Sequence, residues 1–474
     1  MATPEVFPRI LAAEIDGRMH SIRYRQTQFH RLQSALVQHI EEIRHVILEE
    51  SGHSLAEVSA EICLALDEIR THYTSLDLGK DLQEEYSIAH GKNRRGGRRG
   101  AGIVYIIPID HTLFYSVISV LAAALAAGNC IILELARATQ VSELLRKILV
   151  GAFDQDIFAI SEQRPDDEFL SRTVVVNQQA NFSASSVNPR AIAVVDRTAN
   201  ISQAAETLAS ARFRFGGRSP YAPDIVLAHE FILKDFIESV TRASWSHCAV
   251  ESKRSIAEHP SDISLLKETE RVSGTRIVVS GSDWGIVEVQ DRDSPLLLKK
   301  VNEKVLLVHP ITSLDDAIDT VQRNGSPAAS YVFASPESAK YLAQFIDAHL
   351  SWVNHIPMDM LIGPVIPDNS ALGESTRYSV DFFEVPRSQI VIEGMASSRI
   401  KTFLAATGTQ TAAKMWQTSI APLKPTGQRP GKAVGYFEQG LITGGIVALI
   451  SVLAITSTVG YYAVKYGSKL ASRV

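Results

Sequence analysis

The sequence predicts an α/β protein that ends in a membrane-spanning helix. Three observations support this: continuous β-branched runs alternate with helical segments, the composition allows a sizeable core, and an uncharged apolar stretch lies near the C-terminus. The 474 residues allow two or three lobes, and 45% hydrophobic with 21% charged residues is ordinary for a globular chain. The net charge of -5 indicates no nucleic-acid partner.

Helices are expected first. Apolar residues recur at helical spacing from about residue 24 to 76, and Ser54 begins SLAE, a capping-box pattern. The basic segment 91–100, GKNRRGGRRG, follows. We expect it to be a solvated loop or hairpin, and contact with anionic lipid is the alternative.

Alternation of strands and helices begins after the basic segment. The β-branched run 102–108, GIVYIIP, is typical of a strand buried on both faces. A helix is expected over 112–127, closed by a Gly-Asn turn, and a second buried strand over 130–135. This strand–helix–strand unit is the building block of a nucleotide-binding sheet. Further strands are expected at 173–176, 191–196 and 330–335, with a helix over 313–325.

The three cysteines, Cys63, Cys130 and Cys248, are too few and too scattered for a disulfide framework. Cys63 and Cys130 are expected in the core, and a reducing compartment is the default. No CxxC pair or histidine-rich spacing predicts a metal site. The N-terminus lacks the basic and apolar regions of a secretory signal.

The apolar stretch 441–464 carries no charge and exceeds the roughly 20 residues that cross a bilayer core. Tyr461 and Tyr462 suit the interface, and Lys465 begins a basic tail that can reach headgroups. A buried core helix is the alternative. We expect a single-pass C-terminal anchor with the body facing the cytosol, most readily in the endoplasmic reticulum or peroxisome.

The order of segments from about residue 20 to 395 resembles the aldehyde dehydrogenase superfamily. The strongest stretch is GIVYIIPIDHTLFYSVISVLAAALAAGNCIILEL, and the second is FGGRSPYAPDIVLAHEFILKDF. NEKVLLVHPITSLDDAI, SYVFAS, SWVNH and RYSVDFFEVPRSQIV follow in the family's order. A C-terminal membrane helix on such a body most resembles the fatty aldehyde dehydrogenases.

The resemblance implies an aldehyde dehydrogenase-like α/β fold with a Rossmann-type nucleotide-binding domain and an α/β catalytic-type domain. The expected division is a degenerate dinucleotide-binding-type domain (1–186), a catalytic-type domain (187–360), a return strand and oligomerisation segment (361–397), a juxtamembrane linker (398–440), a transmembrane helix (441–464) and a short basic tail (465–474).

The family's catalytic positions carry unsuitable residues. The nucleophilic cysteine corresponds to Pro220, which has no thiol. The general base falls near Ser186. The oxyanion-stabilising asparagine is replaced by Asp110, whose carboxylate would repel a developing oxyanion.

The family's cofactor positions are altered as well. The lysine that holds the adenine ribose becomes Glu134, and the glutamate that binds the nicotinamide ribose becomes Lys300. The segment 177–186 is too short for the helix that cradles the pyrophosphate. We therefore expect no cofactor, with NAD(P) only if the oxidoreductase interpretation holds.

Three functions stay open. The first is a membrane-anchored pseudoenzyme or scaffold, as a homodimer or as a heteromer with an active relative. The second is a repurposed non-redox enzyme for a lipophilic small molecule, in which an apolar tunnel persists and Asp110, His111 and Arg218 supply acid, base and cation. The third is a divergent fatty aldehyde dehydrogenase.

Overall fold

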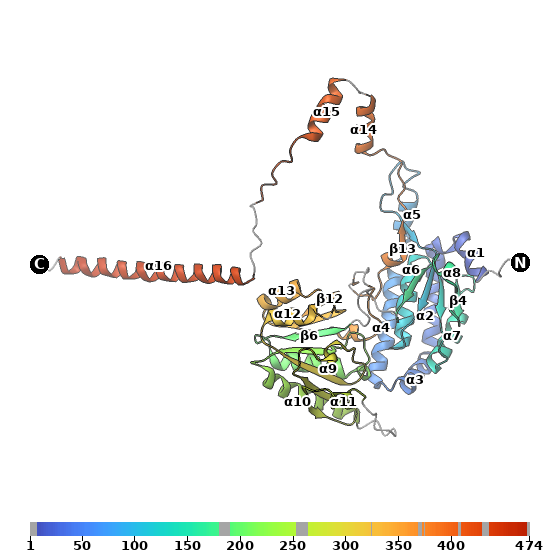
Figure 1. Ribbon diagram of the computed structural model, residues 1–474. Coiled ribbons are helices and arrows are strands. Elements are labelled where there is room, and N and C mark those ends of the chain that lie inside the picture. Colours follow the sequence, from blue (N-terminus) through green and yellow to red (C-terminus); the bar gives the residue numbers. More distant parts are fainter. Residues whose placement is uncertain are drawn as a thin grey trace. The chain divides into compact units, whose positions relative to one another are not determined.

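The computed structural model describes residues 7–179, 190–252, 264–323, 325–367, 372–373, 375–405, 409–428 and 436–471. The chain divides into two compact units, Met1–Ile392 and Glu393–Val474. Figure 1 shows the elements of both units in sequence colours.

The N-terminal part of the first unit is helical, as predicted. The capping box at Ser54 is confirmed: its hydroxyl accepts from the Glu57 N–H, and the Glu57 carboxylate accepts from the Ser54 N–H. The helices are α1 (Pro8–Asp16), α2 (Ile22–Gln38), α3 (Ile40–Ser51), α4 (Leu55–Thr74) and α5 (Leu78–Glu85).

A four-stranded parallel sheet follows, in the order β4-β3-β2-β5. The predicted strand–helix–strand unit is confirmed, because every residue of β2 is buried and α6 is buried along almost its whole length. Asn129 fixes the turn after α6: its amide accepts from the Gly102 N–H and donates to the carbonyls of Ala124 and Phe383. The elements are β2 (Ile103–Ile107), α6 (Leu113–Ala127), β3 (Cys130–Glu134), α7 (Gln140–Ala152), β4 (Phe158–Ser161), α8 (Asp167–Leu170) and β5 (Val174–Asn177).

The second sheet has seven strands in the order β12-β11-β6-β7-β10-β9-β8, parallel except for the β8–β9 pair. Along β6, Ala193 and Val195 belong to one core layer, while Ile192 and Val194 belong to the other. Helices therefore cover both faces (Figure 1), α9 and α10 on the first layer and α12 and α13 on the second. The elements are β6 (Ala191–Val195), α9 (Ile201–Phe213), β7 (Ile225–His229), α10 (Leu233–Ser252), α11 (Ser264–Thr269), β8 (Thr275–Ser280), β9 (Gly285–Val289), β10 (Val305–Ile311), α12 (Leu314–Gln322), β11 (Ala329–Phe333), α13 (Pro336–Phe345) and β12 (Leu350–Val353).

The basic segment 91–100 is held against the end of the first unit. Its last residues form β1 (Arg98–Gly100), antiparallel to β13 (Glu384–Pro386). The Arg98 guanidinium donates to the Glu384 carboxylate at 2.9 Å. The expectation of a solvated loop or hairpin is therefore replaced, for this part, by pairing with a strand almost three hundred residues away.

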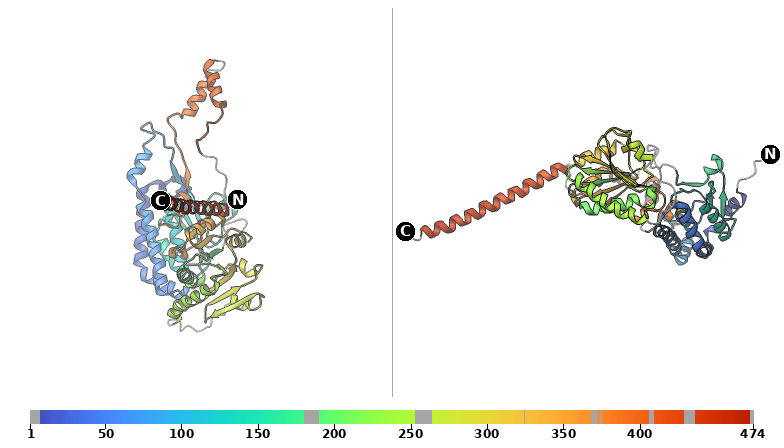
Figure 2. Two further views of the ribbon diagram at one scale, coloured as in Figure 1. Left: turned by 90° about the vertical axis from the view of Figure 1, so that its left-hand side faces the viewer. Right: turned by 90° about the horizontal axis from the view of Figure 1, so that it is seen from below.

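The second unit consists of α14 (Met395–Ala405), α15 (Gln410–Ile420) and α16 (Tyr436–Ala471). Within α16, the 21 residues Gly440–Gly460 are long and apolar enough to cross a membrane, and that window is fully exposed. Within the second unit, none of this window is buried, which favours the membrane-spanning interpretation over a buried core helix. Two further views show α16 as one continuous helix (Figure 2). Helices α14 and α15 lie in the segment that we expected to be a linker.

Candidate functional site

The position that corresponds to the nucleophile is held by a buried ionic contact. Pro220 precedes β7, and its carbonyl accepts a hydrogen bond from the Lys300 ammonium at 2.6 Å. The same ammonium contacts the Asp224 carboxylate at 2.8 Å. Asp224 also accepts from the Val301 N–H, and the Arg212 guanidinium lies 3.6 Å away. The structure thus brings two sequence-predicted site residues, Pro220 and Lys300, into direct contact.

The electrostatics of this contact are those of a structural ion pair. Burial lowers the pKa of Lys300, and the neighbouring Asp224 opposes that shift. Burial also lowers the pKa of Arg212, to about 10. The Lys300 side chain is only 13% exposed, so its ammonium group interacts with Asp224 rather than with solvent.

No side chain next to Pro220 replaces the missing thiol. Ser219 is fully buried, and its hydroxyl accepts from the Tyr221 N–H at 3.3 Å. The Tyr221 hydroxyl accepts from the Ile366 N–H at 3.0 Å. Within the described residues, the contact given for the Ser219 hydroxyl is to a backbone N–H, which cannot activate it as a nucleophile.

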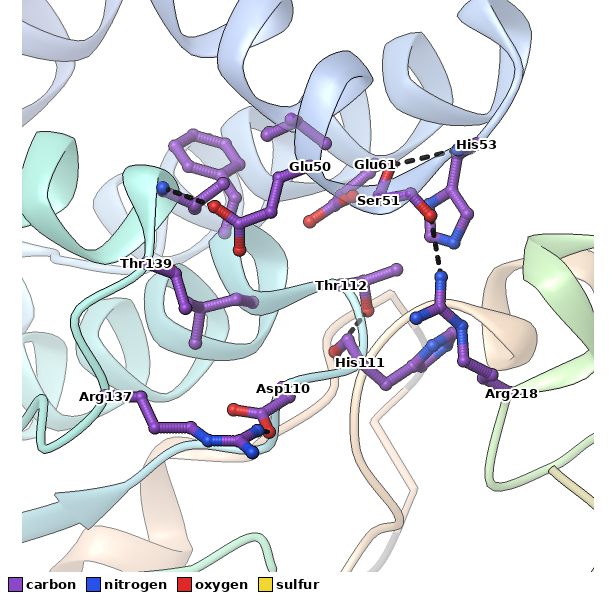
Figure 3. Close-up of a pocket in the computed structure, with 14 residues that line it drawn as sticks. Glu50, Ser51, His53, Glu61, Asp110, His111, Thr112, Arg137, Thr139 and Arg218 are labelled. Atoms are coloured by element: carbon purple, nitrogen blue, oxygen red, sulfur yellow. Dashed lines mark hydrogen bonds and ion pairs between the residues drawn. The ribbon is translucent and has the colours of Figure 1, made fainter. Parts of the chain in front are cut away.

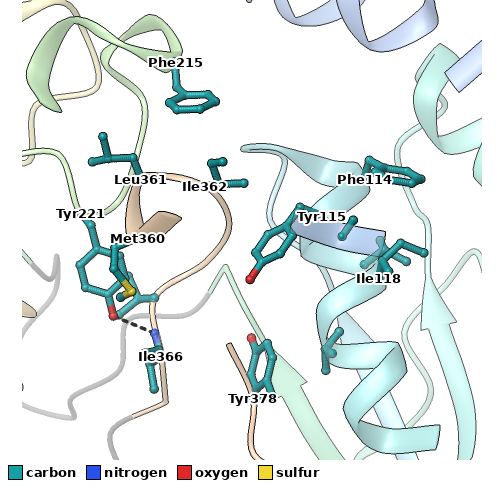
Figure 4. Close-up of a cluster of buried hydrophobic side chains, with 14 of the residues drawn as sticks. Phe114, Tyr115, Ile118, Phe215, Tyr221, Met360, Leu361, Ile362, Ile366 and Tyr378 are labelled. Atoms are coloured by element: carbon teal, nitrogen blue, oxygen red, sulfur yellow. Dashed lines mark hydrogen bonds between the residues drawn. The ribbon is translucent and has the colours of Figure 1, made fainter. Parts of the chain in front are cut away.

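Aromatic side chains fill the interior around Tyr221 (Figure 4). Tyr115, Tyr221 and Tyr378 are all buried. The guanidinium carbon of Arg377 lies 5.8 Å from the Tyr115 ring and 5.7 Å from the Tyr221 ring. Arg377 also donates to the Pro364 carbonyl at 2.7 Å. The described side chains of this region therefore form part of the buried core, and the expectation of an apolar tunnel stays a prediction.

A separate pocket of about 390 Å³ does bring together Asp110, His111 and Arg218. Its walls come from the end of α3, the start of α4, the β2–α6 turn, the β3–α7 connection and Arg218 (Figure 3). Pro220 and Lys300 do not line it. The three residues predicted to supply acid, base and cation therefore share one pocket, apart from the nucleophile position.

The three side chains are each held by a neighbour. The exposed Asp110 carboxylate forms an ion pair with Arg137. Arg218 donates to the Ser51 carbonyl at 2.7 Å. His111 Nε2 lies 2.9 Å from the Leu361 carbonyl, and since a carbonyl only accepts, that nitrogen carries the proton. Burial lowers the pKa of His111 to about 3, so its ring is neutral and weakly basic.

Two pocket residues were missed by the sequence analysis. Glu61 of α4 is 1% exposed, and burial raises the pKa of its carboxyl to about 7. Burial lowers the pKa of His53 to about 4. Among the described residues, Glu61 Oε2 and both ring nitrogens of His53 have no hydrogen-bond partner. In the sequence, the only indication that Glu61 is buried was its position on the apolar face of a predicted helix.

The residues present do not fit a dinucleotide held as the family resemblance implies. The Glu134 carboxylate accepts from the Tyr105 hydroxyl at 2.7 Å, and Lys300 is bound to Asp224. Between β5 and β6 of the other sheet, residues 178, 179 and 190 are described, and they form no helix. Ser186 lies outside the described residues.

Cys130 and Cys63 lie in β3 and α4, in other segments than Pro220. Cys130 is buried in β3, as expected, and burial raises the pKa of its thiol to about 12. Cys63 is exposed on α4, so its predicted place in the core is wrong. Cys248 belongs to α10. Among the described residues, no group of three or more His, Cys, Asp or Glu is arranged to hold a metal ion.

Comparison with known proteins gives a consistent result. Residues 13–155 match the model of the aldehyde dehydrogenase family. Aldehyde dehydrogenase family 3 member B1 of Rattus norvegicus is 24% identical over 358 residues, covering 68% of this chain and 73% of the relative. The rat aldehyde dehydrogenase named dimeric NADP-preferring is 20% identical over 360 residues, covering 68% and 78%.

A solved structure of Staphylococcus aureus AldH in a substrate-bound state superposes with a TM-score of 0.65 at 17% identity, covering 85% of this chain and all of that one. At this identity the likeness concerns the fold alone. The family match, the curated relatives and the fold agree, and this chain carries an aldehyde dehydrogenase family domain in an aldehyde dehydrogenase-like α/β fold with a C-terminal apolar helix.

Proposed function

We propose that this chain is a membrane-anchored aldehyde dehydrogenase-like protein that has lost cysteine-dependent, NAD(P)-linked oxidation and acts as a scaffold or subunit for another enzyme. One observation carries the proposal: the Lys300 ammonium binds the Pro220 carbonyl and the Asp224 carboxylate. The family chemistry needs a thiolate at the first position and a ribose-binding carboxylate at the second. A backbone carbonyl tied to an ammonium supplies neither.

The second unit supports the membrane part of the proposal. Its Gly440–Gly460 stretch is long enough to span a bilayer and carries no charge. Held there, the first unit would be confined to one membrane surface, where a partner enzyme meets it at raised effective concentration. The endoplasmic reticulum and the peroxisome are the membranes that we propose. The name of the dimeric rat relative supports a homodimer, or a heteromer with an active relative.

Two other functions each have one observation in their favour. Non-redox acid–base chemistry on a lipophilic metabolite is favoured by the shared pocket of Asp110, His111 and Arg218. The pKa of about 3 for His111 opposes it, because such a ring accepts a proton poorly at neutral pH. Continued aldehyde oxidation is favoured by the names of the relatives.

The test is an oxidation assay on the full chain in detergent micelles. Long-chain aldehydes are incubated with NAD⁺ or NADP⁺, and the reduced cofactor is followed by its absorbance, with a cysteine-dependent aldehyde dehydrogenase as positive control. We expect no signal above the protein-free blank. Reproducible turnover above the blank would support a divergent dehydrogenase and contradict the proposal.

A second arm tests the scaffold role. The full chain is purified from its membrane by a tag and its partners are identified. We expect a stoichiometric enzyme partner, and recovery of this chain alone would count against a scaffold. The acid–base alternative would be supported instead if the chain converts a lipophilic metabolite and the double variant Asp110→Ala, His111→Ala loses that conversion.

A further inference from the structure

The helices α14 and α15 of the second unit present matched apolar pairs to solvent. In α14, Ile400 and Leu404 are 58% and 66% exposed and lie one turn apart. In α15, Trp416 and Ile420 are each 56% exposed and have the same spacing. Residues four apart on a helix share a face. Each helix therefore offers one apolar stripe that the described residues leave uncovered.

The two helices contact each other, and other apolar residues of the pair are less exposed. Phe403 and Met415 are half-buried, and Ala412 is buried although it lies in an otherwise exposed helix. We call α14 and α15 together the juxtamembrane hairpin. Because Phe403, Ala412 and Met415 are partly or fully covered, the exposed pairs are available to a further partner.

The charged residues of the hairpin and of the segment that follows it are all basic. Residues 395–437 contain no Asp or Glu. Lys401 is paired with Glu393, which precedes α14, at 2.8 Å. Clusters of this size next to a membrane helix attract anionic lipid headgroups. The Lys and Arg residues of 395–437 are Arg399, Lys401, Lys414, Lys424, Arg429 and Lys432.

The hairpin is covalently tied to the candidate membrane helix. Only residues 421–435 separate the end of α15 from the start of α16. A chain of that length reaches at most about 50 Å. A tether this short gives effective concentrations in about the millimolar range, so even a weak affinity for the bilayer surface keeps the hairpin bound.

We propose that the juxtamembrane hairpin is an interfacial membrane-binding element, which lies along an anionic bilayer surface with Ile400, Leu404, Trp416 and Ile420 at the headgroup–acyl boundary. Tryptophan is favoured at that depth, and basic side chains beside an apolar stripe are typical of helices that lie in the interface. The inference rests on the anchor of the proposed function. It adds a second contact, which selects membranes by their anionic lipid.

The primary experiment measures the depth of Trp416 in the full chain. The protein is reconstituted into vesicles of phosphatidylcholine with or without phosphatidylserine, and lipids brominated at known positions quench nearby tryptophans. Subtracting the signal of Trp416→Phe isolates Trp416 from Trp245, Trp284 and Trp352. We expect the Trp416 component to be lost with bromines near the headgroup, to shift to shorter wavelength, and to respond more strongly when phosphatidylserine is present.

A charge variant tests the lipid preference. Arg399→Gln, Lys401→Gln and Lys414→Gln in one chain should abolish the added effect of phosphatidylserine on Trp416. The matched control removes three exposed cations of the first unit, Arg31→Gln, Lys234→Gln and Lys340→Gln. The control should leave the phosphatidylserine effect unchanged. Equal responses of the two variants would overturn the role of the hairpin cations.

Flotation of the vesicles separates failure of this inference from failure of the anchor. A chain that floats with the vesicles while Trp416 stays unquenched overturns the interfacial hairpin and leaves the anchor intact. A chain that does not float overturns both. A third outcome is that Trp416 fluorescence is shielded from solvent in detergent and that the shielding increases with protein concentration. That result would mean that the hairpin binds a second copy of the chain, and it would also overturn the proposal.

Discussion

Two buried ionic regions of the first unit differ in how completely they are paired. Asp224, four residues after Pro220, accepts from the N–H groups of Ala191 and Val301 and from Lys300, with Arg212 close by. In the pocket beside α4, one oxygen of Glu61 and both ring nitrogens of His53 lack a partner among the described residues. Both Asp224 oxygens are therefore paired, although Arg212 Nε beside them has no hydrogen-bond partner among the described residues. The carboxyl of Glu61 and the ring of His53 are left with unpaired polar atoms.

The difference indicates where each region now contributes. Removing one member of the buried Lys300–Asp224 ion pair leaves an uncompensated charge, so the Asp224 region should matter most for stability. The pocket residues are shifted by burial in opposite directions, Glu61 toward the protonated acid and His53 toward the neutral base. We therefore expect Glu61 and His53 to affect how the unfolding free energy depends on pH.

The largest effect is expected from Lys300→Glu, which restores the family's residue type. A carboxylate there would face Asp224 and the Pro220 carbonyl, so we expect a loss of about 3–5 kcal/mol of unfolding free energy. Chemical denaturation of the full chain in detergent, followed by tryptophan fluorescence, measures it. Lys299→Glu is the matched control, because its surface pair with Glu268 is worth less than about 1 kcal/mol. Equal losses in the two variants would refute the special role of Lys300.

The next effect concerns His53 and acid. Burial first of all lowers the folded pKa to about 4, against 6.5 for the free group. The unfolded chain then binds a proton that the folded chain refuses, so stability present above pH 6.5 is lost as the pH falls toward 4, by about 3 kcal/mol. His53→Gln should remove that part of the acid sensitivity. The exposed His45→Gln should not. If the unfolding free energy of His53→Gln falls between pH 6.5 and 4 as steeply as that of the original chain, the buried ring is not neutral in the folded state.

Glu61 should produce the opposite slope with a magnitude no larger. Burial raises its folded pKa to about 7 from 4.5. Stability present below pH 4.5 is therefore lost as the pH rises through 7, by about 3 kcal/mol. Glu61→Gln should remove this loss of stability at rising pH, while the exposed Glu49→Gln should leave it unchanged. Stability curves between pH 4.5 and 8 that coincide for the original chain and Glu61→Gln would contradict the assignment.

The smallest effect is expected from Pro220→Cys. The carbonyl that binds Lys300 is kept, so stability should change by less than about 1 kcal/mol. The new thiol still lacks a base and a cofactor site, so no aldehyde oxidation should appear in the cofactor assay. Gain of oxidation by this single change would mean that the remaining machinery is intact.

The sequence predicted well what depends on local pattern. The strands β2 and β3 and the helix between them follow from continuous buried runs, and the Ser54 capping box follows from two residues three apart. What it missed depends on tertiary burial. On α4, Glu57 and Glu61 face the interior and Cys63 faces solvent, which reverses the usual polarity of a helix. The Lys300–Asp224 pair joins segments 76 residues apart, beyond any local motif.

We propose that the Pro220–Lys300–Asp224 contact stabilises the fold and that the chain binds no dinucleotide. Isothermal titration of the full chain in detergent micelles with NAD⁺ and with NADP⁺ tests it most directly, with an active aldehyde dehydrogenase titrated in parallel. We predict no saturable heat for this chain with either nucleotide. Saturable binding that is weakened by a substitution at Glu134 or Lys300 would contradict the account.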